Sequence, residues 1–385
     1  MRVFIIAGEP SGDRLGAALM AGLKELRPDI TFDGIGGEGM QAEGLTSRFP
    51  MKELSVMGIA EILPKYRALK ARIRETAAQV VETRPDVMIT IDSPDFSLRV
   101  ARLVKEACDV RTVHYVAPTV WAWRPKRAAK MARYIDHVLA LFPFEPPLMT
   151  REGMACDFVG HPVVAEPQAT PEQAKAFRAA HGLGDAPVAL VLPGSRSGEV
   201  GRLAEVFGEA LGLFQKAQPD LKIVVPAAAA VADQVAEAVR GWPVDALVLD
   251  PRAQSAADAA AEKRAAFRAA DVALAASGTV SLELAAARTP MVIAYRMHWL
   301  SFYLIRRMAL VDTVTLVNLV SETRVVPDFL GPDCTAERIA GGLAAVLAEP
   351  DAQNRAMERT MERLGEGGDP PGMRAARAVL QGMQA

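Results

Sequence analysis

The chain has 385 residues, half of them hydrophobic, and its 44 Lys and Arg nearly balance its 46 Asp and Glu. This length favours two domains over one core, and the apolar content excludes a largely disordered chain. The balanced charge argues against a protein that binds nucleic acid over its whole surface.

The expected compartment follows from the cysteines and the N-terminus. Three scattered cysteines without metal-ligand spacing favour a reducing compartment. The apolar run after Met1 is too short for a signal peptide and ends at Glu9, and no stretch reaches the roughly 18 uncharged apolar residues of a membrane span. We therefore expect a cytoplasmic protein that does not cross a membrane.

Short apolar runs alternate with longer helical patterns, such as those at residues 68–83 and 203–218. The runs are continuous and rich in Val, Ile and Leu, as expected for parallel strands that are covered on both faces. They predict an α/β class with doubly wound sheets. The predicted strands are residues 3–7, 87–91, 112–116, 138–141, 188–192, 223–225, 247–249, 272–275 and 291–294.

A break near Gly160, followed by a proline-containing stretch at residues 166–171, predicts the boundary between two Rossmann-like halves. We predict an N-terminal domain over residues 1–165 and a second domain over 166–348. The remaining residues, 349–385, are predicted as a helical tail that packs back toward the first domain.

A loop with two glycines follows the first predicted strand and contains Gly8, Glu9, Ser11, Gly12 and Asp13. Its glycines would let a ligand approach the backbone closely. The alternative is an ordinary turn in which Ser11 or Asp13 caps a helix, and the residues alone do not decide between the two. The loop lacks the glycine spacing of the dinucleotide-binding fingerprint.

Two acids, Asp92 and Asp95, follow the predicted strand at residues 87–91. The carboxyl ends of parallel strands are where α/β sheets place their chemistry. A carboxylate there can act as a general base, although one of the two acids could instead cap the next helix. We favour the functional interpretation.

Two further loops suit a phosphate group. In the first, Gly194 allows close approach, the amides of Ser195 and Arg196 would face a ligand, and the Arg196 guanidinium offers a fork to phosphate oxygens. The alternative is a turn with a solvated arginine. The second is the turn at residues 277–279, which joins a strand to a helix N-terminus.

Glu283, just beyond Thr279, does not have the spacing of a capping box. It is therefore available to accept hydrogen bonds from a diol such as that of a ribose, and the alternative is a plain surface glutamate. The residues of this second loop are Ser277, Gly278 and Thr279.

Trp121, Trp123 and Arg124 precede a basic run at residues 126–133. Aromatic rings beside cations suit a sugar and an anionic group or a lipid interface, but core tryptophans beside a solvated helix are an equal alternative. Two apolar stretches, residues 56–69 and 299–308, fit either core helices or a lipid-facing surface. The sequence has no Asp-x-Asp, no His-Glu-x-x-His and no cysteine pair, so neither a metal nor a cofactor is indicated.

Taken in order, these segments resemble the lipid-A-disaccharide synthases, a family of inverting glycosyltransferases. The resemblance runs from Ala7 to at least Tyr295. It includes residues 36–40, 54–58, 92–96, 120–124, 141–145, 158–162, 192–196 and 277–283.

The resemblance implies the GT-B-like architecture, in which two Rossmann-like domains have parallel sheets that face each other across a cleft. It implies transfer of 2,3-diacylglucosamine from its UDP derivative to 2,3-diacylglucosamine 1-phosphate, giving the β-1,6-linked lipid A disaccharide 1-phosphate and UDP. The first domain would take the acceptor and the second the UDP-sugar. Such enzymes of Gram-negative bacteria act without a metal as peripheral proteins at the cytoplasmic face of the inner membrane, and the resemblance leaves a homodimer open.

The same resemblance assigns roles to individual residues. Asp95 would be the catalytic base, and Arg196 would stabilise the leaving diphosphate. The nucleotide-sugar site would comprise Gly194, Ser195, Arg196, Ser277, Gly278, Thr279, Glu283 and Asn318. The acceptor side would comprise Gly8, Glu9, Ser11, Gly12, Asp13, Asp92, Trp123 and Arg124. Val317, Asp328 and Gly331 depart from the family pattern.

Two other functions fit the same residues. One is a UDP-sugar epimerase, or a glycosyltransferase of the same fold, acting on a soluble substrate. The other is a nucleotide-binding regulatory protein without catalytic activity. An exposed apolar stripe would favour the lipid substrate, and a buried one would remove that support.

Overall fold

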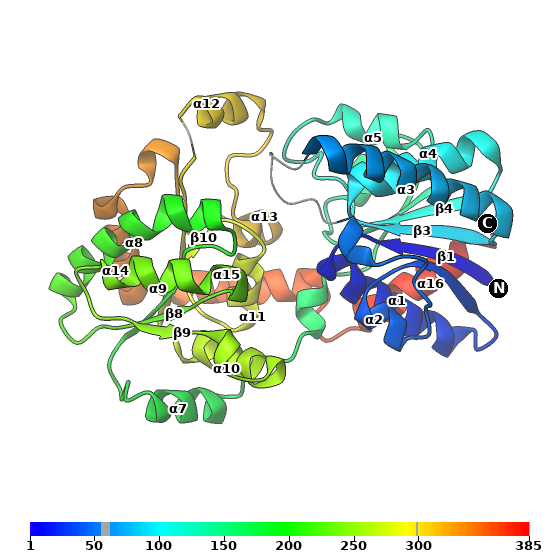
Figure 1. Cartoon of the computed structure of the whole chain (residues 1–385). Coiled ribbons are helices and arrows are strands. Elements are labelled where there is room, and N and C mark those ends of the chain that lie inside the picture. Colours follow the sequence, from blue (N-terminus) through cyan, green and yellow to red (C-terminus); the bar gives the residue numbers. More distant parts are fainter. Residues whose placement is uncertain (55–61, 298, 385) are drawn as a thin grey trace. The chain divides into compact units, whose positions relative to one another are not determined.

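The computed structural model describes residues 1–54, 62–297 and 299–384 (Figure 1). The chain forms two compact units. The first comprises Met1–Ala165 and Leu364–Ala385, and the second comprises Glu166–Arg363. The predicted tail is therefore divided, because residues 349–363 belong to the second unit and only the last part returns to the first.

The first unit contains a six-stranded parallel sheet in the order β2-β1-β3-β4-β5-β6. Along the chain, its helices within the described residues connect one strand to the next. The exception is α16, which comes from the C-terminal end and packs against α1 (Figure 1). The strands are β1 (Arg2–Ala7), β2 (Thr31–Ile35), β3 (Val87–Ile91), β4 (Arg111–Tyr115), β5 (His137–Ala140) and β6 (Ala155–Phe158). The helices are α1 (Pro10–Leu26), α2 (Glu38–Ala42), α3 (Ile62–Thr83), α4 (Pro94–Ala107), α5 (Lys126–Met131), α6 (Pro146–Thr150) and α16 (Pro371–Gly382).

The second unit contains another six-stranded parallel sheet, in the order β12-β11-β10-β7-β8-β9. The strands are β7 (Val188–Leu192), β8 (Lys222–Pro226), β9 (Leu247–Leu249), β10 (Val272–Ala276), β11 (Met291–Tyr295) and β12 (Asp328–Leu330). The helices are α7 (Pro171–Ala180), α8 (Ser197–Ala217), α9 (Ala232–Arg240), α10 (Ala256–Ala269), α11 (Val280–Ala286), α12 (Trp299–Met308), α13 (Leu316–Ser321), α14 (Ala336–Ala348) and α15 (Asp351–Leu364).

The predicted α/β class and parallel sheets are confirmed. Each predicted strand lies within about one residue of an observed one, because continuous apolar runs on central strands are an unambiguous signal. The strands that the sequence did not reveal are β2, β6 and β12. All three lie at a sheet edge and are partly exposed, so their residues are more polar.

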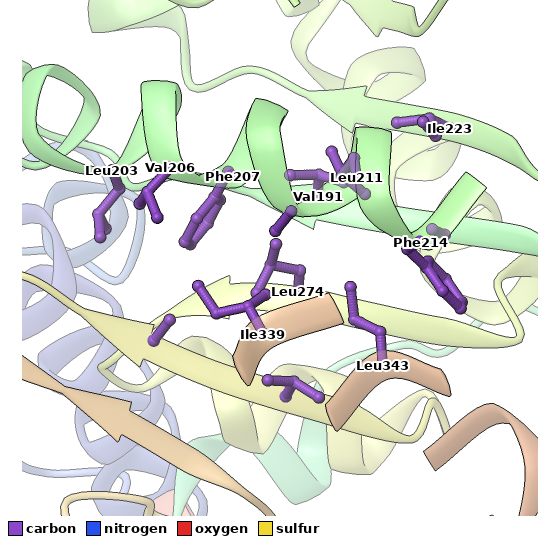
Figure 2. Close-up of a cluster of buried hydrophobic side chains, with 14 of the residues drawn as sticks. Val191, Leu203, Val206, Phe207, Leu211, Phe214, Ile223, Leu274, Ile339 and Leu343 are labelled. Carbon is purple, nitrogen blue, oxygen red and sulfur yellow. The ribbon is translucent and has the colours of Figure 1, made fainter. Parts of the chain in front are cut away.

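Helix α8 shows how the second unit is held together (Figure 2). Its apolar side chains recur every three or four residues and face the sheet, where they meet Val191, Ile223 and Leu274. Ile339 and Leu343 of α14 complete this core. The α8 residues concerned are Leu203, Val206, Phe207, Leu211 and Phe214. This packing fixes the start of α8, and with it the loop that follows β7.

Candidate functional site

Each sheet has one point at which the strand order reverses, and the predicted site loops follow the strands at these points. In the second unit the reversal lies between β7 and β10, which are parallel neighbours with Leu192 opposite Ala275. In the first unit it lies between β1 and β3. The carboxyl ends of strands at such a switch point form the ligand crevice of doubly wound sheets.

The second unit has a cavity of about 790 Å³ at its switch point. This volume is within the range of small-molecule sites. One part of the wall is apolar and comes from β8, β9 and α10, with Ala227, Leu249 and Phe267 among its residues. The polar part is formed by Ser195, Arg196, Glu199, Glu262, Lys263, Ser277, Thr279 and Glu283. The cavity thus brings together both predicted phosphate loops and Glu283.

The loop after β7 differs from the sequence-based prediction, because its amides already have a partner. The backbone N–H groups of Ser195 and Arg196 donate to Oε2 of Glu199, at 3.1 and 3.3 Å. The Arg196 guanidinium also contacts Glu199, with Nη1 3.3 Å from Oε1. We predicted that these amides face a ligand, but here they face a carboxylate of the chain itself.

Gly194 explains how this carboxylate fits. Its backbone is in the left-handed region (φ +121°), and a Cβ there would lie 2.5 Å from the Cβ of Glu199. The space above Gly194 is therefore occupied by the Glu199 side chain. The Arg196 side chain is 78% exposed, so its guanidinium is accessible to a ligand in the cavity without a change of the loop backbone.

The loop after β10 is open by comparison. At Gly278, no atom of the described residues lies within 4 Å of the position that a Cβ would take. A hydrogen bond from α11 holds the loop, because Ser281 Oγ donates to the Gly278 carbonyl at 3.0 Å. Thr279 precedes the first turn of α11 and is exposed. This half of the cavity has room for a ligand against the backbone, as predicted for Gly278.

Glu283 has a partner that the sequence did not suggest. Nζ of Lys263, on α10, lies 2.6 Å from Glu283 Oε2 and 5.0 Å from the centre of the Phe267 ring. Lys263 also lines the cavity. It lies in an alanine-rich helix without a motif of its own, and only the fold brings it to Glu283. The cavity therefore contains two cations, Arg196 and Lys263, each beside a glutamate.

Asn318 lies apart from this cavity among the described residues and is buried on α13. Its side-chain nitrogen donates to the Val326 carbonyl at 2.8 Å, and its oxygen accepts from the Val326 amide at 3.0 Å. These bonds hold α13 to the segment that leads into β12. Both polar atoms of Asn318 therefore have partners within the unit, and its contact with a nucleotide sugar stays a prediction.

Asp328, which departs from the family pattern, supports the same loop. Its Oδ2 accepts from Thr313 Oγ1 at 2.6 Å and from the Val314 amide at 3.2 Å. The Asp328 carboxylate therefore has close partners inside the second unit. Gly331 adopts a left-handed conformation (φ +56°), and a Cβ there would lie 2.5 Å from the Phe302 ring.

In the first unit, the loop after β3 has an unusual backbone. Asp92 and Ser93 both have positive φ, 47° and 45°, which is rare for two successive non-glycine residues. Val116, after the neighbouring strand β4, has φ 82°. Such strain concentrates at functional sites, because elsewhere it is seldom retained.

The two acids of this loop have contrasting surroundings. Asp92 is partly buried, and this burial raises the pKa of its carboxyl, while a backbone hydrogen bond opposes the shift. Asp95 lies in the first turn of α4 with 92% of its side chain exposed, and its carboxylate is 3.7 Å from Arg99. Asp95 is thus accessible to a ligand, whereas Asp92 is held by the loop.

The loop after β1 meets the loop after β3. A Cβ on Gly8 would lie 2.6 Å from Ser93 Oγ and 3.0 Å from Ser93 Cβ, so a larger residue would displace the Ser93 side chain or the loop. Gly12 is buried on α1, and Glu9 and Ser11 are exposed beside it. Asp13 has a structural role: its carboxylate accepts from the amides of Gly37, Gly39 and Met40 at 2.7 to 3.1 Å. Among the described residues no side chain caps α1, so the alternative in which Ser11 or Asp13 caps that helix is not seen; Asp13 instead binds the first amides of α2.

The tryptophan-rich segment after β4 has one tryptophan facing inward and one beside a cation. Trp121 packs edge-on against Phe144, with ring centroids 5.3 Å apart. Trp123 has the Arg124 guanidinium 4.2 Å from its ring, and its Nε1 donates to Thr119 at 3.3 Å. Arg124 is exposed, so the Trp123–Arg124 pair is accessible and its predicted acceptor-side role stays a prediction, whereas Trp121 packs among other aromatic rings.

Glu145 anchors this segment and was not singled out by the sequence. Its buried carboxylate accepts from Trp121 Nε1 at 3.2 Å and from the amides of Leu141 and Phe142 at 3.1 and 3.0 Å. Burial raises the pKa of Glu145 to about 7 despite these bonds. The acid therefore connects the loop after β4 to the loop after β5.

The two apolar stretches of the sequence differ in how much of them the structure describes. Most of residues 56–69 lies outside the residues or side chains that the structure describes, and only Leu69 is seen to pack against the core. In the second stretch Phe302 is buried, but Tyr303 is 56% exposed. Beyond the helix, Leu310 is 58% exposed, so an apolar surface does exist here.

The described part of the chain contains neither a candidate membrane span nor a candidate metal site. Within residues 1–54, 62–297 and 299–384, no helix has the length and apolar character to cross a membrane. In the same ranges no three His, Cys, Asp or Glu side chains are grouped so that they could hold a metal ion.

Solved structures with the same fold are UDP-sugar enzymes. A UDP-GlcNAc 2-epimerase from Neisseria meningitidis, with UDP-GlcNAc bound, aligns over all of both chains with a TM-score of 0.65 and 12% identity. The enzyme from Methanocaldococcus jannaschii aligns over all of both chains with a TM-score of 0.60 and 14% identity. At this identity the likeness concerns the fold, and it confirms the predicted GT-B fold class.

Sequence relatives are much closer. A lipid-A-disaccharide synthase from Ruegeria pomeroyi is 68% identical over 99% of this chain and 95% of its own length. The one from Rhodospirillum centenum is 48% identical over 98% of this chain and 94% of its own length. The family model for lipid-A-disaccharide synthetase matches residues 3–371. The chain therefore belongs to the lipid-A-disaccharide synthase family.

Proposed function

We propose that this protein transfers 2,3-diacylglucosamine from its UDP derivative to the 6-hydroxyl of 2,3-diacylglucosamine 1-phosphate. The products are the β-1,6-linked lipid A disaccharide 1-phosphate and UDP. The observation that carries the proposal is the cavity at the β7–β10 switch point of a chain that belongs to this family. The cavity has two loops, two cations and an open space at Gly278, and this combination suits a nucleotide diphosphate.

The nucleotide would bind with its diphosphate between Arg196 and the open Gly278 loop. Arg196 offers a planar fork to phosphate oxygens, and Lys263 adds a second positive charge at the cavity wall. Glu283 would accept hydrogen bonds from the ribose hydroxyls, with Lys263 holding its carboxylate in place at 2.6 Å. The apolar wall near Phe267 would pack against the base.

In the reaction, Asp95 would accept the proton of the acceptor 6-hydroxyl as that oxygen attacks the anomeric carbon. The bond between this carbon and the diphosphate oxygen breaks, the configuration inverts, and the electron pair leaves with UDP. Charge therefore grows on the diphosphate, where preorganised cations are most effective. The exposure of Asp95 supports its role as the base, and the strained loop beside it fixes the start of α4.

The acceptor would bind to the first unit, with the Trp123–Arg124 pair near its 1-phosphate. A guanidinium stacked on an indole keeps its donors free for an anion, while the ring offers a face to the sugar. The glycine-rich loop after β1 would shape the same side of the site, because Gly8 brings it against Ser93.

Both substrates carry acyl chains, so we propose that the protein works as a peripheral protein at the cytoplasmic face of the inner membrane of a Gram-negative bacterium. The exposed apolar side chains of α12 and the following loop support this proposal, since Arg306 and Arg307 lie among them and would meet anionic headgroups. The exposed apolar residues are Tyr303, Met308, Leu310 and Val314.

The test is a thin-layer assay with the UDP-linked diacyl sugar and its 1-phosphate acceptor in detergent micelles, in the presence of EDTA. We expect a disaccharide 1-phosphate and one UDP per product, and neither when the acceptor is omitted. Glucosamine 1-phosphate without acyl chains is the matched acceptor control. Equal turnover of that soluble acceptor, or epimerisation of UDP-GlcNAc, would contradict the proposal.

A further inference from the structure

The donors of the Gly194 loop are occupied by an anion that belongs to the chain. Both loop amides and the Arg196 guanidinium converge on the carboxylate of Glu199, at 3.1 to 3.3 Å. Glu199 lines the cavity and retains only 15% of its side-chain exposure. The Arg196 guanidinium is also the group that the proposed function assigns to the diphosphate, and the two amides beside it would face the same phosphate.

The loop is shaped for this occupant. The Glu199 Cβ and Oε2 lie 2.5 and 2.8 Å from the position of a Cβ on Gly194, so a larger residue at 194 would expel the carboxylate. The Gly278 loop on the neighbouring strand has no such occupant among the described residues. The Gly194 loop therefore already holds a carboxylate of the chain, whereas the Gly278 loop is open to a ligand.

A ligand phosphate must share or displace this charge, and the cost depends on the charge of the ligand. A terminal phosphate such as that of UDP carries about −1.5 to −2 at pH 7, whereas each phosphate of a UDP-sugar carries about −1. Repulsion by Glu199 is therefore stronger for the product UDP than for the UDP-sugar substrate, since Coulomb energy scales with the product of the charges.

We propose that Glu199 is a specificity-determining residue that competes with the diphosphate for the Ser195 and Arg196 donors and so favours release of UDP over release of the UDP-sugar. This inference rests on the proposed function, because it assumes that UDP binds in this cavity. After sugar transfer, Glu199 returns to the donors as UDP leaves. Product release limits turnover in many enzymes, so such a competitor would sustain the cycle.

The experiment measures the Kd of UDP and of UDP-GlcNAc, a soluble probe without a terminal phosphate, by calorimetry on the full chain. In Glu199→Gln the side chain keeps an acceptor for the amides but loses its charge. We expect UDP to bind about tenfold more tightly than to the wild type and UDP-GlcNAc at most about threefold more tightly, because a unit charge a few ångströms away is worth about this much. The UDP dissociation rate should fall in proportion.

Glu205→Gln is the matched control, since Glu205 is an exposed residue of the same helix α8 and its loss changes the net charge equally. It should leave both Kd values within about twofold of the wild type. Glu199→Ala, with its thermal melting recorded, is measured in parallel and should shift UDP in the same direction as Gln.

An unchanged or weaker affinity for UDP in both folded Glu199 variants would overturn the inference, because Glu199 would then organise the loop instead of competing. Equal tightening of both ligands would also overturn it. Failure of the wild type to bind UDP at all would instead contradict the proposed nucleotide site, so the two hypotheses fail in different ways.

Discussion

The two units have sheets of the same kind and place polar loops at equivalent switch points, yet the groups there have opposite surroundings. The second unit has a cavity in which each cation is paired with a glutamate. The first has two carboxylates after one strand, on a strained backbone, and one of them is almost fully exposed. In the proposed function, this difference corresponds to a second unit that binds the anionic nucleotide and a first unit that accepts a proton.

The sharpest way to break this comparison is to remove the exposed carboxylate of the first unit. In Asp95→Asn the base is lost without a change of shape, and we expect kcat to fall by about 10³-fold, in the range typical of general bases. Turnover is measured by UDP release with the diacylated acceptor. Asp92→Asn is the control, and a larger loss of kcat there than in Asp95→Asn would make Asp92 the base.

A second test concerns the buried Glu145 of the first unit. Its pKa is raised from 4.5 to about 7 by burial, so the folded state holds the proton more tightly than the unfolded state. The stability contributed by the protonated acid is complete below about pH 4.5 and is lost as the pH rises through 7, by on the order of 3 kcal/mol.

Glu145→Gln removes this titration. The melting temperature of Glu145→Gln relative to the wild type should therefore rise between pH 5 and pH 8. Contributions of other titrating groups are common to both proteins and cancel in this difference. A difference that stays constant with pH would mean that Glu145 is ionised throughout, against its burial.

On the side of the second unit, Arg196→Ala should weaken UDP binding by about 10- to 100-fold, the usual effect of a charge-assisted hydrogen bond. Arg196→Lys keeps the charge but not the fork and should recover only part of the loss. Calorimetry with UDP provides the measurement. Wild-type affinity in Arg196→Ala would place the diphosphate elsewhere.

The smallest effect is expected at Glu283. If its carboxylate accepts from the ribose diol, the wild type should prefer UDP over 2′-deoxy-UDP by about tenfold, as for a hydrogen bond to a charged group. Glu283→Gln should reduce that preference to about twofold or less. A preference unchanged by the substitution would leave Glu283 as a partner of Lys263 alone.

The sequence predicts the central strands and the loops after them, because uninterrupted apolar runs are typical of buried parallel strands. It does not predict β2, β6 and β12, since these three edge strands are partly exposed and have polar residues among their apolar ones. Gly278 and Glu283, which the sequence assigns to the nucleotide site, both line the cavity of the second unit.

Side-chain partners could not be predicted in this way. Lys263 precedes Glu283 by 20 residues and lies on another helix, so tertiary packing sets its position beside Glu283. The turn at Gly194 has the sequence of a ligand-binding loop whether a ligand or Glu199 fills it. For Asn318 the family resemblance suggested a ligand contact, and its two hydrogen bonds to the backbone of Val326 could not be anticipated from the sequence.

The division of roles between the units is tested most directly by titrating UDP calorimetrically into Asp95→Asn and Arg196→Ala side by side with the wild type. The account predicts that Asp95→Asn binds UDP within about twofold of the wild type although it turns over slowly, while Arg196→Ala binds at least about tenfold more weakly. Loss of UDP binding in Asp95→Asn, with wild-type binding in Arg196→Ala, would contradict it.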